Sequence, residues 1–411
     1  MTIEKSIDQQ VALLMQGIEM GDEQLKAAMG KELRERLIDS QKSGVPLRVY
    51  CGYDPTSPDL HLGHTVTMRK LKQFQDLGHQ AIFVIGSFTA LVGDPSDKDK
   101  ARPRLSSEQV MANAKTYTDQ AFKILDSEKT EVRFNHNWLS EVKLEQVVEI
   151  ASNFTVQQFL VRDNFSKRYE AGEPIWLHEF FYALLQGYDA TELRADVQMG
   201  ATEQLFNLLA GRKLQEAMGM KPQVALTIPV LVGTDGNMRM AKSTGNTIGI
   251  NEPPDEMYGK VMSIPDSAMG NYFRLVTRWE PDEVQRLEHG LESGELHPRD
   301  VKMKLAREIV EIYHGEDAVE PAESAFVRLF QEGGKPEEIA EHTYEAGLPV
   351  IEVMVSSGLV ESKSQARRLI KQKGVRIADE VIEDPYFSID FDEPKVLQVG
   401  KRRFIRLIKA G

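Results

Sequence analysis

Residues 47–94, LRVYCGYDPTSPDLHLGHTVTMRKLKQFQDLGHQAIFVIGSFTALVGD, decide the fold class. At the start of this stretch, apolar residues alternate with other residues, which is the period of a strand. After a turn-rich loop, apolar side chains recur on one face of a helix that ends before Gly78. The run 80–94 is continuously apolar, as expected of a strand that is covered on both faces. Strand, helix and strand at this length indicate a βαβ crossover, so we predict an α/β fold with a parallel sheet.

The composition is that of a globular protein with more than one domain. The chain has 411 residues, of which 27% are charged and 41% hydrophobic. No apolar run approaches the roughly 18–20 residues that span a bilayer, so we expect no membrane partner. The first residues lack a cationic segment and a cleavage site, and a single cysteine, Cys51, excludes a disulfide framework and a cysteine-based zinc cluster. We therefore expect a cytoplasmic protein.

The sign of the charge reverses near the C-terminus. The whole chain carries −13, but residues 361–411 hold 12 Lys and Arg against 8 Asp and Glu, which is +4. The stretches QARRLIKQKGVRI (365–377) and GKRRFIRLIKAG (400–411) mix these cations with aliphatic residues at strand and helix spacing. This pattern predicts a folded basic surface rather than a solvated tail.

The rest of the chain alternates helix and strand patterns before it becomes helical. We expect helices over 107–127, 139–168 and 177–193, and strands over 195–200 and 224–233. A Gly-rich basic loop, DGNMRMAKSTGNT, occupies 235–247, and an all-helical region follows to about residue 332. The polar stretch EEIAEHTYEAGLP (337–349) is typical of a linker.

The two histidines in HLGH stand where the first loop becomes a helix. Side chains three apart on a helix are neighbours, so His61 and His64 point the same way, and Gly63 leaves room for a flat ligand. Unpaired N–H groups at a helix start favour anions, which suits a nucleotide triphosphate. A zinc site would need a third ligand, which no HExxH motif or carboxylate spacing supplies. From this stretch alone, histidines that merely begin a helix remain an alternative.

A second motif favours the triphosphate site over histidines that merely begin a helix. HLGH is similar to the HIGH signature of class I aminoacyl-tRNA synthetases, and RMAKSTGN (239–246) resembles their KMSKS signature followed by LGN. The two occur in the family's order, about 180 residues apart, and the first lies between a strand and a helix. The blocks VYCGYDPTSPDLHLGH, GDPS and FYALLQGYD resemble those of bacterial tyrosyl-tRNA synthetases, and this resemblance covers essentially the whole chain.

The resemblance implies a division into domains. Residues 1–235 would form a Rossmann-like class I catalytic domain with a parallel sheet, including a dimer-contact insertion at about 130–175. Residues 236–250 would be a mobile loop of the KMSKS type, which we call the flap. An α-helical anticodon-side domain would follow over 251–335, and a small α+β RNA-binding domain of the ribosomal-protein type over 346–411. The family is homodimeric.

The resemblance also implies the reaction. A tyrosine–tRNA ligase activates L-tyrosine with ATP to give tyrosyl-adenylate and pyrophosphate, and then transfers the tyrosyl group to the 3′-terminal adenosine of tRNA(Tyr). The attacking carboxylate is already ionised, so catalysis reduces to positioning and to stabilising charge on the phosphates. Mg²⁺ would accompany ATP, and we expect no metal held by the protein.

Site residues follow by matching motifs. In the family's manner, Asp94 with Tyr182 and Gln186 would hold the tyrosine ammonium, and Tyr50 and Asp189 would bind its phenolic oxygen. A phenylalanine would leave the last two unpaired, a discrimination for which tyrosyl-tRNA synthetases are a standard example. Gln204 completes this group. The residues expected to act on the phosphates are Thr56, His61, His64, Arg239 and Lys242. Further ATP contacts are expected from Gly52, Asp54, Lys98, Arg102, Glu203 and Met240. On the basic surface, we expect tRNA contacts from Arg367, Arg368, Lys371 and Lys373.

The chain differs from the family's motifs at several positions, and three other protein classes are alternatives. Arg239 and Ala241 stand where the family usually has Lys and Ser, and GATEQ (200–204) replaces GGSDQ or GGTDQ, which crowds the ribose edge at Ala201 and Glu203. Asp97 stands where glycine is usual. The rivals are a tryptophanyl-tRNA synthetase, a shorter HxGH-type nucleotidyltransferase, and a non-catalytic RNA-binding descendant of a synthetase.

Overall fold

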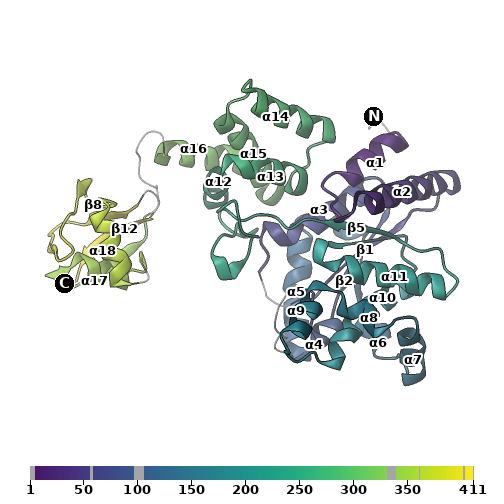
Figure 1. Cartoon of the computed structure of the whole chain (residues 1–411). Helices are drawn as coiled ribbons and strands as arrows, with labels where there is room; N and C mark the ends of the chain where they lie inside the picture. The colour runs from purple at the N-terminus through teal and green to yellow at the C-terminus, as the bar shows by residue number, and fades with distance from the viewer. Residues whose placement is uncertain are drawn as a thin grey trace. The chain divides into compact units, whose positions relative to one another are not determined.

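The computed structural model describes residues 5–55, 59–96, 106–330, 339–360, 362–400 and 403–410 (Figure 1). The chain divides into two compact units, Met1–Val319 and Glu320–Gly411, and each is described by itself. Within the described residues, no helix combines the length and apolar character needed to cross a bilayer.

The first unit is built on a parallel sheet of five strands in the order β3-β2-β1-β4-β5. The strands are β1 (Arg48–Tyr53), β2 (Gln80–Ile85), β3 (Thr130–Phe134), β4 (Val197–Ala201) and β5 (Val224–Ile228). β1 pairs with β2 on one side, with Tyr50 opposite Ile82, and with β4 on the other, with Tyr50 opposite Gln198. The strand order thus reverses at β1, which is where doubly wound folds bind their ligands. The predicted α/β class is confirmed.

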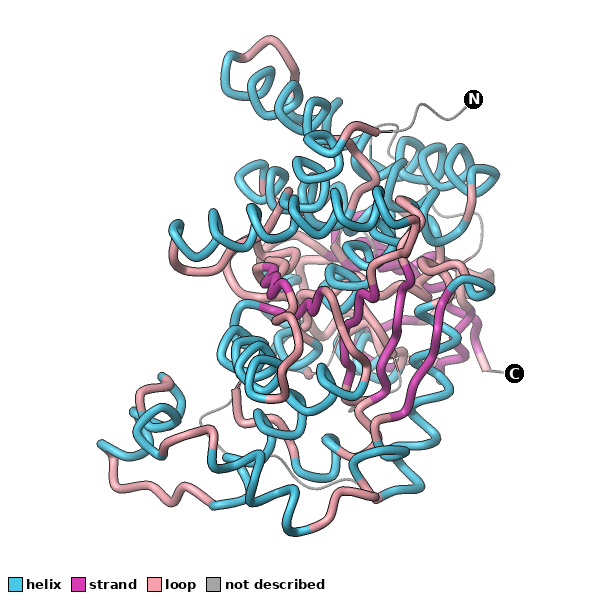
Figure 2. The backbone as a smooth tube through the Cα atoms, turned by 90° about the vertical axis from the view of Figure 1, so that its right-hand side faces the viewer, coloured by secondary structure: helices cyan, strands magenta, loops and turns pink. Residues whose placement is uncertain are grey.

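Helices lie on both sides of these strands (Figure 2). They include α3 (Leu62–Asp76), α5 (Ser107–Ala121), α10 (Leu177–Glu192) and α11 (Leu205–Ala217). α10 and α11 pack closely, because a Cβ atom at Gly187 would lie only 3.2 Å from the backbone of Ala210 and Gly211. The stretch 139–168, expected to be helical, contains the short helices α7 (Leu144–Ser152), α8 (Val156–Leu160) and α9 (Asp163–Glu170).

The apolar run 80–94 is not one strand. β2 ends at Ile85, and the short helix α4 (Thr89–Val92) follows. The reason is a tight turn at Gly86, where a Cβ atom would overlap the side chains of Asp54 and Thr89. An apolar run alone does not distinguish a buried strand from a buried helix.

The remaining helices come before the first strand of the sheet or after its last strand in the sequence. α1 (Ile7–Met15) and α2 (Glu23–Ser43) precede the sheet. The predicted helical region contains α12 (Pro254–Met262), α13 (Met269–Val276), α14 (Pro281–Ser293), α15 (Pro298–His314) and α16 (Val319–Phe330), the last at the division between the units. A hydrogen bond of 2.8 Å between the hydroxyls of Thr65 and Tyr313 joins α3 to α15.

The second unit has its own sheet and core. Its strands are β6 (Glu341–Tyr344), β8 (Val375–Ile377), β9 (Glu380–Val381), β11 (Lys395–Val399) and β12 (Arg403–Lys409), in the order β6-β12-β11-β8-β9. A two-stranded sheet joins β7 (Leu348–Pro349) to β10 (Ser388–Ile389), and the helices are α17 (Val350–Ser356) and α18 (Lys363–Lys371). Val350, Met354, Ala366 and Leu397 are buried in the shared core.

The stretch 337–349 is more than the linker we expected. β6 lies within it and pairs in parallel with β12 at the edge of the sheet. Three of its four residues, Glu341, His342 and Thr343, are not buried, which explains the linker-like composition. The sheet therefore takes in residues before 346, where we expected the unit to begin. The other domain boundaries stay predictions.

Candidate active site

Both histidine rings accept hydrogen bonds from backbone N–H groups at the start of α3. His61 caps α3, and its Nδ1 accepts from the backbone N–H of Gly63 at 3.2 Å. The backbone N–H of His61 donates to Nδ1 of His64, also at 3.2 Å, and the ring centroids are 3.8 Å apart. Because Nδ1 is the acceptor in both rings, the neutral imidazoles carry their proton on Nε2. Each histidine therefore offers an Nε2–H donor.

The pair is neutral at physiological pH. Burial is the main reason that the pKa of His61 is lowered to about 3 and that of His64 to about 4. The positive charges of Lys242 and Arg239 also lower both pKa values. The histidines are thus donors rather than cations, and the positive field at this point comes from the flap.

The flap lies against the histidine loop. His61 and Gly249 form an antiparallel bridge, and the backbone N–H of Leu62 donates to the carbonyl of Ile248 at 2.9 Å. A Cβ atom at Gly63 would lie 3.5 Å from Cβ of Met240. Lys242 Nζ is 3.5 Å from a carboxylate oxygen of Asp59, two residues before His61. The structure therefore brings the two sequence signatures together.

Asn246 shapes the flap from within. Its Oδ1 accepts from the backbone N–H of Ala241 at 2.9 Å and from the hydroxyl of Thr244 at 2.7 Å. Its Nδ2 donates to the carbonyl of Arg239 at 3.1 Å and to the carboxylate of Asp235. One side chain thus fixes the turn that carries both flap cations.

A buried carboxylate lies behind the first strand. Both oxygens of Asp189 accept hydrogen bonds, one from Trp138 Nε1 at 2.7 Å and one from Asn135 Nδ2 at 3.2 Å. Burial raises the pKa of Asp189 to about 7, against the opposing effect of these two donors. The hydroxyl of Tyr50, itself buried, donates to the carbonyl of Gln186 at 3.4 Å. Tyr182 and Asp189 of α10 are therefore buried rather than on a surface stripe.

Asp54 connects this group to the loop that follows β1. Its carboxylate accepts from the Tyr182 hydroxyl at 2.9 Å and from the Thr89 hydroxyl at 2.8 Å. Asn135 Nδ2 also donates to the Thr89 hydroxyl, at 3.1 Å, so the network continues to Asp189. We predicted Asp54 as an ATP contact, and the structure places it against a predicted tyrosine contact.

A second network joins the remaining predicted tyrosine contacts. Gln204 Nε2 donates to Asp94 at 2.6 Å. The fully buried Asn207 on α11 donates from Nδ2 to Gln204 Oε1 at 2.9 Å and to Gln186 Oε1 at 3.0 Å. Arg162 lies nearby and donates to Ser96, which in turn donates to Asp94.

Four residues that bond directly to predicted site residues were not themselves predicted from the sequence. Asn135, Trp138, Thr89 and Asn207 hold the predicted side chains in place. The sequence carries one faint signal for Asn207, which is the single polar residue in the segment LFNLLAG (205–211) of α11. The others have no signal, because their partners are distant in the chain.

The structure places the other predicted residues as follows. Thr56, Lys98, Arg102 and the departure at Asp97 lie outside the described residues. Gly52 is the last residue but one of β1 and has open space around its Cβ position, and Glu203 lies half-buried in the turn between β4 and α11. In the second unit, Arg367, Arg368 and Lys371 lie exposed on α18 and Lys373 just after it. Of these cations, Arg367 lies over the ring of Tyr386 and Lys373 pairs with Glu383.

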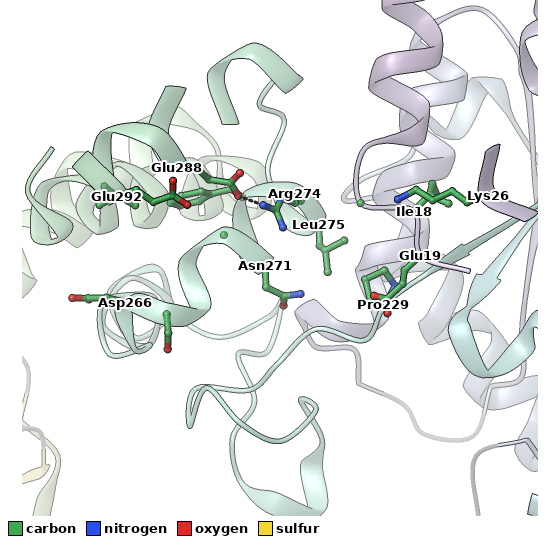
Figure 3. A pocket seen from close by; sticks show the side chains of 15 residues that line it. Ile18, Glu19, Lys26, Pro229, Asp266, Asn271, Arg274, Leu275, Glu288 and Glu292 are labelled. Carbon is green, nitrogen blue, oxygen red and sulfur yellow. Dashed lines mark ion pairs between the residues drawn. The ribbon is translucent and has the colours of Figure 1, made fainter. Parts of the chain in front are cut away.

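Outside these networks, the described residues include a cavity but no cluster suited to a metal ion. No group of three or more His, Cys, Asp or Glu side chains among them is placed to hold a metal ion. A cavity of about 810 Å³ lies between the α1–α2 connection and helices α13 and α14 (Figure 3). Arg274 and Glu288 form an ion pair in its wall, and none of the described residues lining it is a predicted substrate contact.

Comparison with known proteins decides the family. Residues 42–331 match the class I tRNA synthetases (W and Y), and residues 349–393 match the S4 domain. The chain is 47% identical over 406 residues to the tyrosine–tRNA ligase of Moorella thermoacetica, which covers 98% of this chain and 97% of that one. It belongs to the tyrosine–tRNA ligase family. The ligase of Photobacterium profundum is also 47% identical, with 98% of this chain and 99% of that one covered.

Solved structures of this family share the fold. The mitochondrial tyrosyl-tRNA synthetase of Aspergillus nidulans superimposes with a TM-score of 0.63 at 22% identity, covering 79% of this chain and 94% of that one. The tyrosyl-tRNA synthetase of Archaeoglobus fulgidus, determined with L-tyrosine, gives 0.59 at 21% identity, with 76% and 99% covered. The predicted family is confirmed, and the tryptophanyl, nucleotidyltransferase and non-catalytic alternatives are not favoured.

Proposed function

We propose that this chain joins L-tyrosine to tRNA(Tyr) in two steps. In the first, the tyrosine carboxylate attacks the α-phosphorus of ATP, a new O–P bond forms, and pyrophosphate leaves with the electrons of the broken bond. In the second, a hydroxyl of the 3′-terminal adenosine of tRNA attacks the tyrosyl carbonyl of the adenylate, an ester bond forms, and AMP leaves with the electrons of the broken bond. The observation that carries this proposal is the buried Asp189, held by two donors beside Tyr50 in a chain that is 47% identical to tyrosine–tRNA ligases.

The amino acid would bind between the two hydrogen-bond networks. The ammonium would meet Asp94, Tyr182 and Gln186, with Gln204 and Asn207 holding these groups in place. The phenol would reach Tyr50 and Asp189. Because Trp138 and Asn135 already donate to Asp189, its oxygens act as acceptors, and the phenol O–H is the matching donor. Phenylalanine cannot make this bond and would leave the carboxylate short of a partner.

The triphosphate would lie between the histidines and the flap. His61 and His64 would donate from Nε2 to phosphate oxygens, and Lys242 and Arg239 would approach the same charge from the flap. We assign Thr56, Lys98 and Arg102 to the phosphates as well. Gly52, Asp54, Glu203 and Met240 would line the nucleotide. Mg²⁺ bound to ATP would supply further charge neutralisation, and the residues named here provide positioning and donors without a general base.

The second unit would bind RNA, and the protein would act in the cytoplasm. The S4 match covers α17 and α18, and the exposed cations on and after α18 would meet phosphates. We assign tRNA contacts to Arg367, Arg368, Lys371 and Lys373.

A second copy of the chain would cover an exposed apolar surface. Leu144, Val161 and Leu177 are 78%, 76% and 72% exposed, and Val148 and Val156 are exposed in the same segment. Apolar side chains gathered in this way are typical of a protein–protein interface. We propose that the predicted segment of about 130–175, together with Leu177, forms the contact of a homodimer.

Exchange of pyrophosphate into ATP, measured with each of the twenty amino acids, tests the function. We expect exchange with tyrosine and little or none with phenylalanine. Exchange with tryptophan alone, or with no amino acid, would overturn the proposal.

A further inference from the structure

A single buried amide joins the two signature segments. Gln120 on α5 is 4% exposed. Its Oε1 accepts a hydrogen bond from the backbone N–H of Leu60 at 2.9 Å and another from Nδ2 of Asn251 at 3.3 Å. Leu60 immediately precedes His61, and Asn251 immediately follows the flap. One carbonyl oxygen therefore contacts the chain on both sides of the proposed phosphate site.

The amide stands at the end of a short antiparallel ladder. The N–H of Leu62 donates to the carbonyl of Ile248 at 2.9 Å, and the N–H of Ile250 donates to the carbonyl of Leu60 at 3.2 Å. Lys123, just beyond α5, adds a bond from Nζ to the carbonyl of Ile250 at 3.3 Å. Two rungs alone leave the pairing of two loop segments weakly specified, and an acceptor shared by both segments fixes their register.

The register matters because this root is one of the contacts that hold the flap, with its two cations, against the histidine loop. Lys242 and Arg239 lie within the flap, and their charges already act on the histidine pair. A slip of this pairing by one residue would turn the side chains of the paired segment to the opposite face and shift the flap that leads into it. The register at Leu60 and Ile250 thus helps to set where the cations stand relative to the Nε2–H donors.

We propose that Gln120 is a positioning residue for adenylate formation, which fastens the root of the flap to the histidine loop. This inference rests on the proposed ATP site. Gln120 acts through Leu60 and Asn251 and does not touch the substrates. Its loss is therefore expected to weaken the use of ATP while leaving the tyrosine pocket, built on α10 and α11, unchanged.

The test compares two buried glutamines in the full-length protein. Gln120→Leu removes the shared acceptor at similar side-chain volume. Gln75→Leu is the matched control: Gln75 is 5% exposed and bonds Asp126 and Thr130 at the amino end of β3, whereas the site residue Asn135 follows the carboxyl end of that strand. Melting temperature, kcat, and KM for ATP and tyrosine are measured by tyrosine-dependent pyrophosphate exchange.

For Gln120→Leu we expect kcat/KM for ATP to fall about 5- to 50-fold, with KM for tyrosine changed less than twofold. Gln75→Leu should lower the melting temperature without this ATP-specific loss. If Gln120→Leu does not fold, Asn251→Ala, at an exposed position, tests the same inference. We expect this variant to lower kcat/KM for ATP by a smaller factor. Equal effects of the two glutamine variants, or an unchanged Asn251→Ala, would overturn the inference. An inactive wild-type protein would instead contradict the proposed function.

Discussion

At Asp189, burial and hydrogen bonding act on the same carboxyl group in opposite directions. Burial raises its pKa to about 7, and the donors Trp138 and Asn135 oppose this change. The group therefore titrates in the physiological range, next to the proposed phenol site. A carboxylate accepts a hydrogen bond from the phenol O–H better than a neutral carboxylic acid does. The binding of tyrosine should therefore depend on the protonation of Asp189.

We expect kcat/KM for tyrosine to rise with pH between about 6 and 8, as Asp189 loses its proton. Trp138→Phe removes a donor that favours the ionised form, so the midpoint should move to higher pH. Tyrosine-dependent pyrophosphate exchange at saturating ATP measures both profiles. Trp279→Phe, which alters a tryptophan packed on Phe273 in the helical region, is the control. A midpoint that does not move in Trp138→Phe contradicts this account of Asp189.

Asn207 offers a second test at this scale. Its amide donates to both Gln186 and Gln204, and removing a partner from a buried polar group costs about 1–3 kcal/mol. Asn207→Leu should therefore raise KM for tyrosine roughly 5- to 150-fold, since about 1.4 kcal/mol is a factor of ten. KM for ATP should change less than twofold. Equal increases in both constants would show that Asn207 supports the fold rather than the amino-acid pocket.

At the scale of elements, the flap is an irregular segment that side chains hold in shape. Its turn depends on Asn246, which bonds the backbone of Ala241 and Arg239. The flap has little regular structure apart from a single 3-10 turn at Lys242–Thr244. Its geometry therefore rests on few contacts, and one substitution should alter it.

Asn246→Ala should lower kcat/KM for ATP about tenfold, because the turn that carries Arg239 and Lys242 loses several hydrogen bonds, each worth about 0.5–1.5 kcal/mol. KM for tyrosine should stay the same. Asn237→Ala, at an exposed position of the same loop, is the control and should behave as wild type. Equal activity of the two variants would refute the role of Asn246.

Sequence patterns predicted the elements better than their contacts. Alternation identified β1, and the apolar face of α3 identified that helix, because both patterns are local. The strand β6 was missed because an edge strand has little buried surface. Asn135, Trp138 and Asn207 were missed because each is a single polar residue whose partner lies elsewhere in the chain. By contrast, His61, His64 and Lys242 could be proposed from the sequence because they lie in short motifs with a known chemistry, and their roles stay predictions.

At the scale of the molecule, the two units suggest a division of labour between amino-acid activation and RNA binding. The first unit contains the proposed tyrosine and ATP sites, and the second contains the S4 match with its cations. Activation needs no RNA, whereas transfer does. Changes to the second unit should therefore separate the two steps.

The double substitution Arg367→Glu and Arg368→Glu should lower kcat/KM for tRNA in aminoacylation at least tenfold, because two phosphate-binding charges are reversed. Tyrosine-dependent pyrophosphate exchange should remain within twofold of wild type and serves as the internal control. Raising the salt concentration should lower kcat/KM for tRNA in both proteins, and more steeply in the wild type than in the variant. Unchanged aminoacylation would remove α18 from the RNA-binding surface.

The apolar segment 144–177 gives a test of assembly. Leu177→Asp places a charge in the proposed interface, and sedimentation should show a shift from dimer to monomer at micromolar concentration. Val45→Asp, at another exposed apolar side chain outside this segment, should not change the mass. A wild-type protein that sediments as a monomer would contradict the proposed dimer.

A double-substitution cycle between the histidine loop and the flap tests the central claim, that both act on one triphosphate. His64→Asn, Lys242→Met and the combined variant are compared by kcat/KM for ATP in tyrosine-dependent pyrophosphate exchange. If His64 and Lys242 stabilise the same phosphate charge, the combined loss should differ from the sum of the single losses by more than about 0.5 kcal/mol. Losses that add within about 0.3 kcal/mol would mean that the two residues act independently, and they would contradict the proposal that both act on one triphosphate.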